Sequence, residues 1–416
     1  MRGKKKAAVV GAGYVGLATA AVLSETCHVT LVDTDREKVR QINEGRCPIK
    51  DADLEEYFES HWNALRAICD GREVYAESDF VLIAVPTDLD PDRGSFRVSI
   101  VEAVISDICE AVRSAGRKTA PVIVIRSTVP VGFTSAMRHE ISERYPDMKT
   151  CFLVSPEFLR EGTALRDMRN PSRIVLGTAK VEEVEEAEKK ALEFVELLRG
   201  GMQDPGNVRV MILCEREAEA AKLFSNTYLA MRAAFFNELD TYAEALGLCS
   251  ESLNRAVSAD PRIGSFYNNP SFGYGGSCLP KDSRELLSEF QREGIPQSLI
   301  GAIVKSNMVR KDYVAGRILK MAGDRPVGIY RLTSKKASGN FRQSAVWDIM
   351  RMLREAGCAY IVYEPDFPEG GKTSFQLMRD FDRFQKACGV IAANRKGEEL
   401  KDTELCVYTR DLYEEN

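Results

Sequence analysis

The ten residues Gly273–Asp282, GYGGSCLPKD, combine residue types that can do covalent chemistry. Their three glycines allow tight turns and a close approach of the backbone to a ligand. Cys278 is soon followed by Pro280, and proline is favoured at the first position of a helix, where free amides stabilise negative charge. We therefore expect Cys278 to stand just before a helix N-terminus, a setting that favours the nucleophilic thiolate. The alternative is a buried structural cysteine beside a tight loop.

A second chemical signature, GAGYVG, occupies residues 11–16 and follows an apolar run at 7–10. A glycine-rich turn between a strand and a helix, with an acid about 20 residues on, is typical of a dinucleotide site. Gly11 would make the turn, Gly13 would admit the pyrophosphate, and Gly16 would allow close helix–strand packing. Asp33, after the second strand, would accept hydrogen bonds from a ribose and repel a 2′-phosphate. This favours NAD over NADP.

Further apolar strands are predicted at 80–85, 122–125 and 152–154, with a helix over 100–112. Continuous apolar runs are typical of buried parallel strands. Thr87, Thr128 and Glu157 follow these strands, and ligands of open α/β sheets lie beyond the carboxyl ends of the strands. We expect these residues to face a common crevice; for each, a turn or capping role is the alternative.

The middle of the chain predicts a long helix over 215–246, ended by Gly247. Lys222 and Asn226 are four residues apart, so both project from one face of this helix. On such a helix both side chains could equally be solvated. A loop rich in Asn, Pro and Gly at 260–271 then leads to Cys278, and long loops of this kind are commonly functional. A second helix is predicted over 296–321.

The last ninety residues predict a second compact α/β unit. Strands are expected at 326–330, 359–363, 389–393 and 405–408, with a helix over 344–355. This part has no GxGxxG, so it should hold a different nucleotide or none. Lys335, Lys336 and Arg342 could meet phosphates there, or form a solvated basic loop.

Composition excludes several classes of protein. The 416 residues suggest two or three domains, and 44% hydrophobic with 29% charged residues is typical of a soluble globular protein. The net charge of −5 does not suggest nucleic-acid binding. The apolar stretch after the basic first residues is broken by glycines and lacks a cleavage pattern, which argues against a signal peptide. No 18-residue apolar run follows, which argues against a membrane span. We therefore expect a cytoplasmic protein. Eleven cysteines without a CxxC pair, and three scattered histidines, predict reduced thiols and no metal site.

These residues together resemble the nucleotide-sugar 6-dehydrogenases, the UDP-glucose/GDP-mannose dehydrogenase family, and most closely its short bacterial members that act on UDP-glucose. The resemblance covers nearly the whole chain. Its motifs occur in order: GAGYVGL, AVPT, RSTVPVGFT, SPEFLREG, the Lys222/Asn226 helix, DPRIGSFYNNPSFGYGGSCLPKD, GIYRL and NFRQSA. It implies an α/β fold of two Rossmann-like doubly wound domains joined by a central helical dimerisation segment. The implied boundaries are 1–205 for the NAD-binding domain, 206–322 for the central segment and 323–416 for the UDP-binding domain.

The resemblance implies a four-electron oxidation of UDP-glucose at C6 to UDP-glucuronate, consuming two NAD and one water. Cys278 matches the family nucleophile, which would form a thiohemiacetal with the C6 aldehyde and then a thioester that water cleaves. Lys222 and Asn226 match groups that stabilise charge on the C6 oxygen. Groups that order or activate water match Asp282, Thr128 and Glu161. The sequence does not divide the role of general base between Lys222 and Asp282.

The resemblance also carries over two sets of binding residues. The cofactor set is Gly11, Gly13, Tyr14, Val15, Gly16, Asp33, Lys38, Thr87, Thr128, Glu161, Lys281 and Arg342. The substrate set is Glu157, Phe158, Leu159, Arg160, Glu161, Lys222, Asn226, Arg262, Tyr267, Asn268, Asn269, Pro270, Ser271, Gly275 and Lys335. Arg262 resembles an arginine that a partner subunit contributes to the sugar site, which implies a homodimer. The Phe-Lys-Pro…Asp-Asp-Ile-Arg pattern of many members is replaced here by Tyr330-Arg331 and Asn340-Phe341-Arg342, which puts the phosphate contact at Lys335 in doubt.

Three rival interpretations stay open from the sequence. GDP-mannose and UDP-N-acetylhexosamine dehydrogenases share the cysteine and the fold, although the loop Tyr267–Pro270 looks like that of the UDP-glucose members. A two-electron hydroxyacid dehydrogenase could use Lys222 and Asn226, with Cys278 merely structural. A catalytically inactive nucleotide-binding protein is the third.

Overall fold

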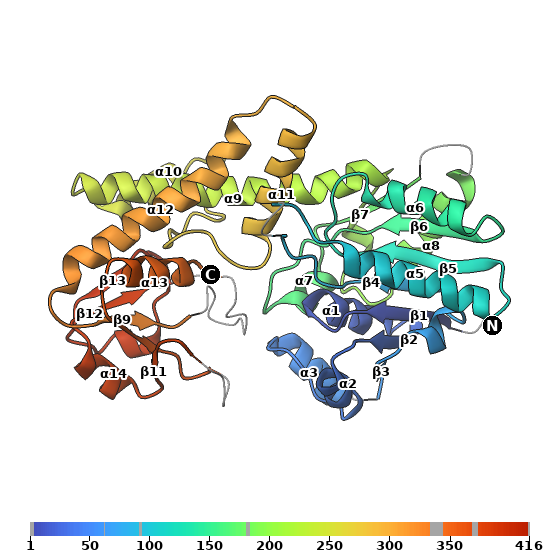
Figure 1. Cartoon of the computed structure of the whole chain (residues 1–416), viewed down its shortest axis with the longest axis horizontal. Helices are drawn as coiled ribbons and strands as arrows, with labels where there is room; N and C mark the ends of the chain where they lie inside the picture. The colour runs from blue at the N-terminus through green and yellow to red at the C-terminus, as the bar shows by residue number, and fades with distance from the viewer. Residues whose placement is uncertain are drawn as a thin grey trace. The chain divides into compact units, whose positions relative to one another are not determined.

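The computed structural model describes residues 4–61, 63–90, 94–179, 184–332, 344–367 and 373–414. The chain separates into two compact units, Met1–Phe224 and Ser225–Asn416 (Figure 1). The boundary falls within one uninterrupted helix, α9 (Glu215–Ala245). The division into 1–205, 206–322 and 323–416 stays a prediction.

Unit 1 contains an eight-stranded sheet in the order β3-β2-β1-β4-β5-β6-β7-β8. All neighbouring strands are parallel except β6 and β7, so the last two strands run against the first six. The order reverses at β1, where ligands of such sheets bind beyond the carboxyl ends. The strands are β1 (Lys5–Val10), β2 (Cys27–Val32), β3 (Arg66–Ile68), β4 (Phe80–Ile83), β5 (Thr119–Ile125), β6 (Lys149–Val154), β7 (Arg173–Thr178) and β8 (Arg209–Cys214).

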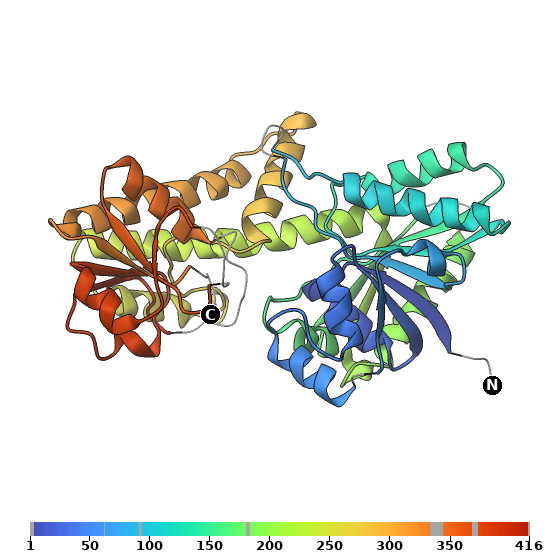
Figure 2. The ribbon, with the colours of Figure 1, turned by 60° about the horizontal axis from the view of Figure 1, so that its bottom comes forward.

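Helices cover both faces of this sheet because its strands are apolar on both sides. In β1, Ala7 and Val9 face one hydrophobic core and Ala8 and Val10 face the other. The first core includes side chains of α1 (Tyr14–Leu23), α2 (Arg36–Asn43), α3 (Ala52–Ser60), α7 (Ala164–Arg169) and α8 (Val184–Arg199). The second includes side chains of α4 (Arg72–Tyr75), α5 (Ser99–Ser114) and α6 (Phe133–Arg144), and Figure 2 shows α5 and α6 together on their side of the sheet.

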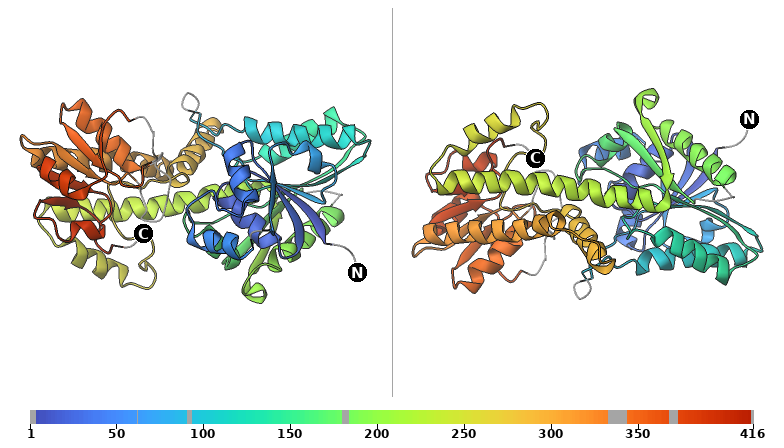
Figure 3. Two further views of the ribbon diagram at one scale, coloured as in Figure 1. Left: turned by 90° about the horizontal axis from the view of Figure 1, so that it is seen from below. Right: turned by 90° about the horizontal axis from the view of Figure 1, so that it is seen from above.

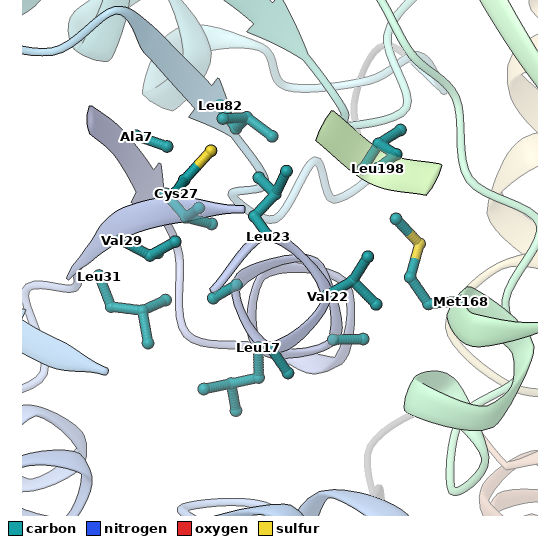
Figure 4. Packing of buried hydrophobic residues seen from close by; sticks show 14 of the residues in the cluster. Ala7, Leu17, Val22, Leu23, Cys27, Val29, Leu31, Leu82, Met168 and Leu198 are labelled. Carbon is teal, nitrogen blue, oxygen red and sulfur yellow. The ribbon is translucent and has the colours of Figure 1, made fainter. Parts of the chain in front are cut away.

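The first helix is buried along almost its whole length, which fixes the turn that precedes it. Figure 4 shows Leu17, Val22 and Leu23 of α1 among Val29 and Leu31 of β2, and these five side chains are buried. Small residues between them let the helix lie close to the sheet. The N-terminus of α1 is therefore held at the carboxyl end of β1.

Unit 2 begins with helices and ends with a second sheet. Its helices are the rest of α9, α10 (Ser250–Ser258), α11 (Leu279–Arg292), α12 (Leu299–Ala322), α13 (Ala345–Glu355) and α14 (Phe381–Ala387). The α9 and α12 helices lie side by side, as Figure 3 shows. They are joined by ion pairs from Arg310 to Asp240 at 2.6 Å and from Arg317 to Glu244 at 3.2 Å.

The second sheet is parallel and has the order β11-β10-β9-β12-β13. One face packs on α12 and α13, and the other packs on α14. The strands are β9 (Val327–Tyr330), β10 (Tyr360–Tyr363), β11 (Gln376–Met378), β12 (Val390–Ala393) and β13 (Val407–Thr409). Short 3-10 helices occur at Pro205–Asn207 and Glu398–Leu400.

The two sheets repeat one turn in hydrogen-bonding detail. After β1, the N–H of Gly11 donates to Val32 at 2.8 Å, and Asp33 accepts from the N–H of Ala12 at 2.7 Å. After β9, the N–H of Arg331 donates to the carbonyl of Tyr363 at 2.9 Å, and Glu364 accepts from the N–H of Leu332 at 2.8 Å. The first residue of both turns has a positive φ, +101° at Gly11 and +59° at Arg331. We call these the first and second strand-end turns.

The predicted α/β class with two doubly wound sheets and a helical segment between them in sequence is confirmed. The helix predicted over 215–246 is α9, and that predicted over 296–321 is α12. Strands β3, β7, β8 and β11 were not predicted from the sequence. Within the described ranges, no helix is both long enough and apolar enough to cross a membrane.

Candidate active site

The first strand-end turn is packed tightly at two glycines and open at the third. A Cβ at Gly11 would lie 2.4 Å from the carbonyl oxygen of Ala84, and one at Gly16 would lie 1.8 Å from that of Gly11. Neither position can accept a side chain without a shift of the backbone. A Cβ at Gly13 would meet no atom within 4 Å. The turn therefore leaves space at Gly13, where a ligand can approach the N-terminus of α1.

Asp33 lies directly after β2 and is bonded to this turn. Besides the bond from Ala12, its Oδ1 accepts from the N–H of Asp35 at 2.9 Å. Lys38 Nζ lies 3.9 Å from Asp33 Oδ2. An acid beside an open glycine turn at a helix N-terminus fits a dinucleotide, whose pyrophosphate is stabilised by the helix amides. The individual contacts of these residues with NAD stay predictions.

Thr87 and Thr128, which follow β4 and β5, are directly joined. Thr87 is buried, and its hydroxyl donates to the carbonyl oxygen of Thr128 at 2.7 Å. The hydroxyl of Ser127 donates to the carbonyl oxygen of Val85 at 2.7 Å. The ends of two neighbouring strands thus meet at one edge of the sheet.

Glu157 and Lys222 form a buried ion pair within unit 1. Lys222 Nζ donates to the Glu157 carbonyl oxygen at 2.6 Å and to its Oε1 at 2.8 Å, and the two side chains are 4% and 7% exposed. Burial opposes ionisation of Glu157, but attraction to Lys222 outweighs it and holds the pKa of this carboxyl below its ordinary value. The pair holds the Lys222 ammonium at the carboxyl end of β6.

Arg126, directly after β5, adds a second buried cation near this pair. Its Nη1 donates to Ser155 Oγ at 2.9 Å, while its Nε has no hydrogen-bond partner among the described residues. Burial lowers the pKa of the guanidinium to about 10, and attraction to Glu157 opposes that shift. Two buried cations, Lys222 by direct contact and Arg126 by attraction, therefore act on the Glu157 carboxylate. Their excess positive charge would stabilise negative charge on a bound group.

The residues after Glu157 form a loop held at both ends. The N–H of Leu159 donates to Glu157 Oε2 at 2.7 Å. Arg160 turns to Asp167, to which its Nη2 and Nε donate at 2.7 and 3.0 Å. Glu161 follows and is half-buried. The loop thus has a fixed path between β6 and α7.

Cys278 stands immediately before α11, as the sequence predicts. Pro280 lies in the first turn of this 14-residue helix. The thiol is half-buried, and its Sγ lies 3.5 Å from Ser277 Oγ. Gly276 has φ of +88°, which only glycine adopts without strain. The sulfur is thereby held at a helix N-terminus, as the sequence predicts.

Asp282 lies one turn further along α11 and has no exposed surface. Its Oδ2 accepts from Asn226 Nδ2 of α9 at 2.5 Å, and its Oδ1 lies 3.0 Å from Lys281 Nζ. The N–H of Asp282 donates to the carbonyl oxygen of Cys278 at 2.9 Å. The helix and this hydrogen bond therefore bring together the predicted nucleophile, the predicted amide and the predicted acid.

The predicted substrate loop includes both exposed and buried residues. Tyr267 has φ of +56° and is 42% exposed, whereas Asn268 is buried. Arg262 is among the most exposed side chains described, at 88%, and pairs with Asp260 at 2.6 Å. Its exposure leaves it accessible to a second copy of the chain; the subunit contact itself stays a prediction.

The two units divide the predicted site residues between them. Unit 1 carries Gly11, Gly13, Tyr14, Val15, Gly16, Asp33, Lys38, Thr87, Thr128, Glu157–Glu161 and Lys222. Unit 2 carries Asn226, Arg262, Tyr267–Ser271, Gly275, Cys278, Lys281 and Asp282. Lys335, Lys336 and Arg342 lie outside the described residues.

Sequence reasoning missed Arg126, and it missed that Glu157 pairs with Lys222 and Asn226 with Asp282. Arg126 had a usable signal, because a charged residue that directly follows a continuous apolar strand is unusual unless the end of that strand is functional. The two pairs join residues 65 and 56 positions apart, and no local pattern in the sequence connects them.

The chain is similar to known dehydrogenases both in sequence and in fold. Residues 5–192 match the NAD binding domain, and residues 216–309 the central domain, of the UDP-glucose/GDP-mannose dehydrogenase family. The chain is 42% identical to UDP-glucose 6-dehydrogenase of Streptococcus pneumoniae over 98% of its length and 99% of the relative's. It is 39% identical to the Campylobacter jejuni protein of that name, with the same coverage. A solved UDP-glucose dehydrogenase from Pyrobaculum islandicum matches with a TM-score of 0.85 and 25% identity, over 99% of this chain and 96% of that one.

Proposed function

Because the chain belongs to the UDP-glucose/GDP-mannose dehydrogenase family, we propose that it oxidises UDP-glucose at C6 to UDP-glucuronate. One observation carries the proposal beyond family membership. A thiol, Cys278, precedes the helix that also carries the buried Asp282, and that carboxylate accepts a hydrogen bond from Asn226. A two-electron alcohol dehydrogenase needs no such thiol, whereas oxidation to a carboxylate does.

The cofactor is NAD, in keeping with the match of residues 5–192 to the family's NAD binding domain. We assign its pyrophosphate to the open turn at Gly13 and its adenosine ribose to Asp33, with Lys38 beside it. When bound, NAD would supply the hydride acceptor for each of the two oxidations at C6. In the whole reaction one alcohol and one water give a carboxylate, while two hydrides and three protons leave.

The chain's own residues would handle the thiol, the protons and the developing charge. In this proposal the Cys278 thiolate forms a bond to the aldehyde carbon, and the resulting thiohemiacetal oxygen is stabilised by the Lys222 ammonium and the Asn226 amide. Loss of the second hydride leaves a thioester on Cys278. A water then adds to its carbonyl carbon, the carbon–sulfur bond breaks, and the thiolate returns. Asp282, together with Thr128 and Glu161, orders or deprotonates that water.

The Lys222 environment supports a role as a cation rather than a base. Its Nζ already donates to the carboxylate and the carbonyl oxygen of Glu157, which directs the ammonium as a fixed hydrogen-bond donor. With Lys222 as the stabilising cation, the role of general base falls in this proposal to Asp282, whose carboxylate Asn226 holds near Cys278 on the same helix.

We further propose a cytoplasmic homodimer in which Arg262 of one copy reaches the sugar site of the other. The exposure of this arginine supports the assignment. We also propose the three-part division of roles at residues 1–205, 206–322 and 323–416.

The yield of NADH per sugar tests the function. Purified protein with excess NAD and limiting UDP-glucose should give two NADH per sugar, and GDP-mannose or UDP-N-acetylhexosamines should give little. A yield of one would refute the thioester route and favour a two-electron dehydrogenase. Preference for another sugar nucleotide would move the proposal to that member of the family.

A further inference from the structure

The loop Asn268–Phe272 has no regular secondary structure, yet several different elements of unit 2 hold it. Asn268 Nδ2 donates to Asn254 Oδ1 of α10 at 3.1 Å. The N–H of Ser271 donates to Asn237 Oδ1 of α9 at 2.8 Å. The path of the loop is therefore set by side chains from distant parts of the chain.

Asn269 is held by the segment that follows β13. Its Nδ2 donates to Asp411 Oδ1 at 2.7 Å, and its Oδ1 accepts from the N–H of Leu412 at 3.0 Å. Donor and acceptor of one amide are thus both bonded to residues 411–412. These bonds anchor the loop more than 140 residues away in sequence.

Asp411 connects this anchor to a second segment. Its side chain has no exposed surface. Oδ1 also accepts from the N–H of Glu414 at 3.0 Å, and Oδ2 accepts from the N–H of Lys396 at 2.9 Å. Both carboxylate oxygens are therefore used within the protein, and Asp411 can affect a substrate only through other residues.

Arg395 holds the next residue of the loop and depends on the same carboxylate. Its Nη1 donates to the carbonyl oxygen of Pro270 at 2.6 Å and lies 4.0 Å from Asp411 Oδ1. Burial lowers the pKa of this guanidinium, and attraction to Asp411 opposes that shift. Asp411 thus supplies the negative charge that compensates the buried cation.

We propose that Asp411 is a positioning residue for substrate binding, which fixes Asn269 directly and Pro270 through Arg395. The inference rests on the proposed function and on the predicted substrate residues 267–271. A shift of about 1 Å in a binding group can cost about a hundredfold in rate. Loss of this carboxylate should therefore weaken the interaction with UDP-glucose and leave that with NAD unchanged, because none of the predicted cofactor residues lies within 267–271.

The variant Asp411→Asn tests the proposal. An amide offers one acceptor oxygen and two donors, whereas the carboxylate accepts from Asn269, Lys396 and Glu414. We expect KM for UDP-glucose to rise about tenfold or more, with KM for NAD and the two NADH per sugar at saturation unchanged. Hydrogen exchange of peptides covering 268–272 should become faster. The matched control is Asp402→Asn, an exposed aspartate of the same unit, which should behave like wild type.

A second pair of variants asks whether the effect passes through Asn269. Asn269→Asp would set two carboxylates against each other and should also raise KM for UDP-glucose. Combining it with Asp411→Asn restores a donor opposite an acceptor at this contact, so KM should fall below that of Asn269→Asp. Full recovery is not expected, because Arg395 still lacks its counter-charge. If Asp411→Asn does not fold, Arg395→Lys carries the test, because it keeps Asp411 and its bonds to Asn269, Lys396 and Glu414. An unchanged KM for UDP-glucose in Arg395→Lys would then overturn the path through Pro270.

Each outcome decides one question. An unchanged KM for UDP-glucose in Asp411→Asn, an equal rise in KM for NAD, or a double variant no better than Asn269→Asp would overturn the positioning role. Failure of the wild-type protein to reduce NAD with UDP-glucose would instead refute the proposed function. Calorimetry of wild type and Asn269→Asp with UDP-glucose alone would then show whether the loop still contributes to binding it.

Discussion

Changing Glu157 to Gln should destabilise unit 1 strongly, although the substitution keeps the shape of the side chain. At 2.8 Å from Lys222 Nζ, the carboxylate contributes an attraction of about 6 kcal/mol at an effective dielectric constant of about 20. The amide can still accept a hydrogen bond but leaves the ammonium buried without its counter-charge. Breaking one partner of a buried pair costs about 3–5 kcal/mol. We expect a loss of unfolding free energy at the lower end of this range, about 3 kcal/mol, since the glutamine side chain still offers Lys222 an acceptor oxygen.

Thermal unfolding followed by circular dichroism measures this effect. For a unit of this size, about 3 kcal/mol corresponds to a midpoint lowered by roughly 6–12 °C. The control is Glu77→Gln, which breaks the Lys6–Glu77 pair at 2.9 Å, where the side chains are 57% and 71% exposed. The two pairs match in chemistry and distance but differ in burial, so the control should change the midpoint little.

The pH dependence supplies an independent check. The pKa of Glu157 in the folded protein lies below its ordinary value of 4.5, so its stabilisation is complete above that pH and is lost as pH falls through the folded value. The difference between wild type and Glu157→Gln should therefore be largest at neutral pH and shrink in acid. The double variant with Lys222→Met should be more stable than the sum of the single changes predicts. Equal midpoints for Glu157→Gln and Glu77→Gln, or additive effects in the double variant, would refute the reasoning.

Three further predictions concern the two chemical signatures. Cys278→Ala should bind NAD and UDP-glucose in calorimetry but form no carboxylate detectable by chromatography; full turnover would show that the thiol is not the nucleophile. Gly13→Ala should keep the wild-type unfolding midpoint, because its Cβ enters open space, but should lose NAD affinity, because that space is where the ligand approaches. Gly16→Ala should lower the unfolding midpoint by several degrees, because its Cβ would lie 1.8 Å from a carbonyl oxygen. Equal midpoints for the two variants would contradict this prediction. Asp33→Asn should weaken NAD binding less than Asp33→Ala, measured by titration, since the amide oxygen can still accept from the turn.

Regular elements of the fold were predictable where one residue pattern decided them. The α9 helix was predicted within one residue because a long stretch without proline ends at Gly247. The strands β1, β4 and β5 were predicted because both faces of each are buried and apolar. By contrast, β8 was missed. Arg209 is exposed and the five residues after it are half-buried, and the short sequence RVMILC fits a helix as well as a strand.

The site was predictable where the chemistry lies within a short segment. Cys278, Pro280 and Asp282 follow each other closely, so their place at the start of a helix followed from local rules. Contacts such as that of Asn269 with Asp411 join separate segments through single hydrogen bonds, and they depend on how helices and strands pack. Periodicity in the sequence carries no information about such contacts.

The second strand-end turn changes how the first should be understood. There Glu364 accepts a hydrogen bond from the N–H of Leu332, just as Asp33 accepts one from the N–H of Ala12. Arg331 occupies the position at which the first turn has Gly11. An acidic residue at this position thus has a structural role even in a turn without the GxGxxG pattern. Removing Asp33 would therefore have two effects on cofactor affinity: the loss of a ribose contact and a less firmly held turn between strand and helix. The two effects have to be measured separately before specificity for NAD is assigned to this one carboxylate.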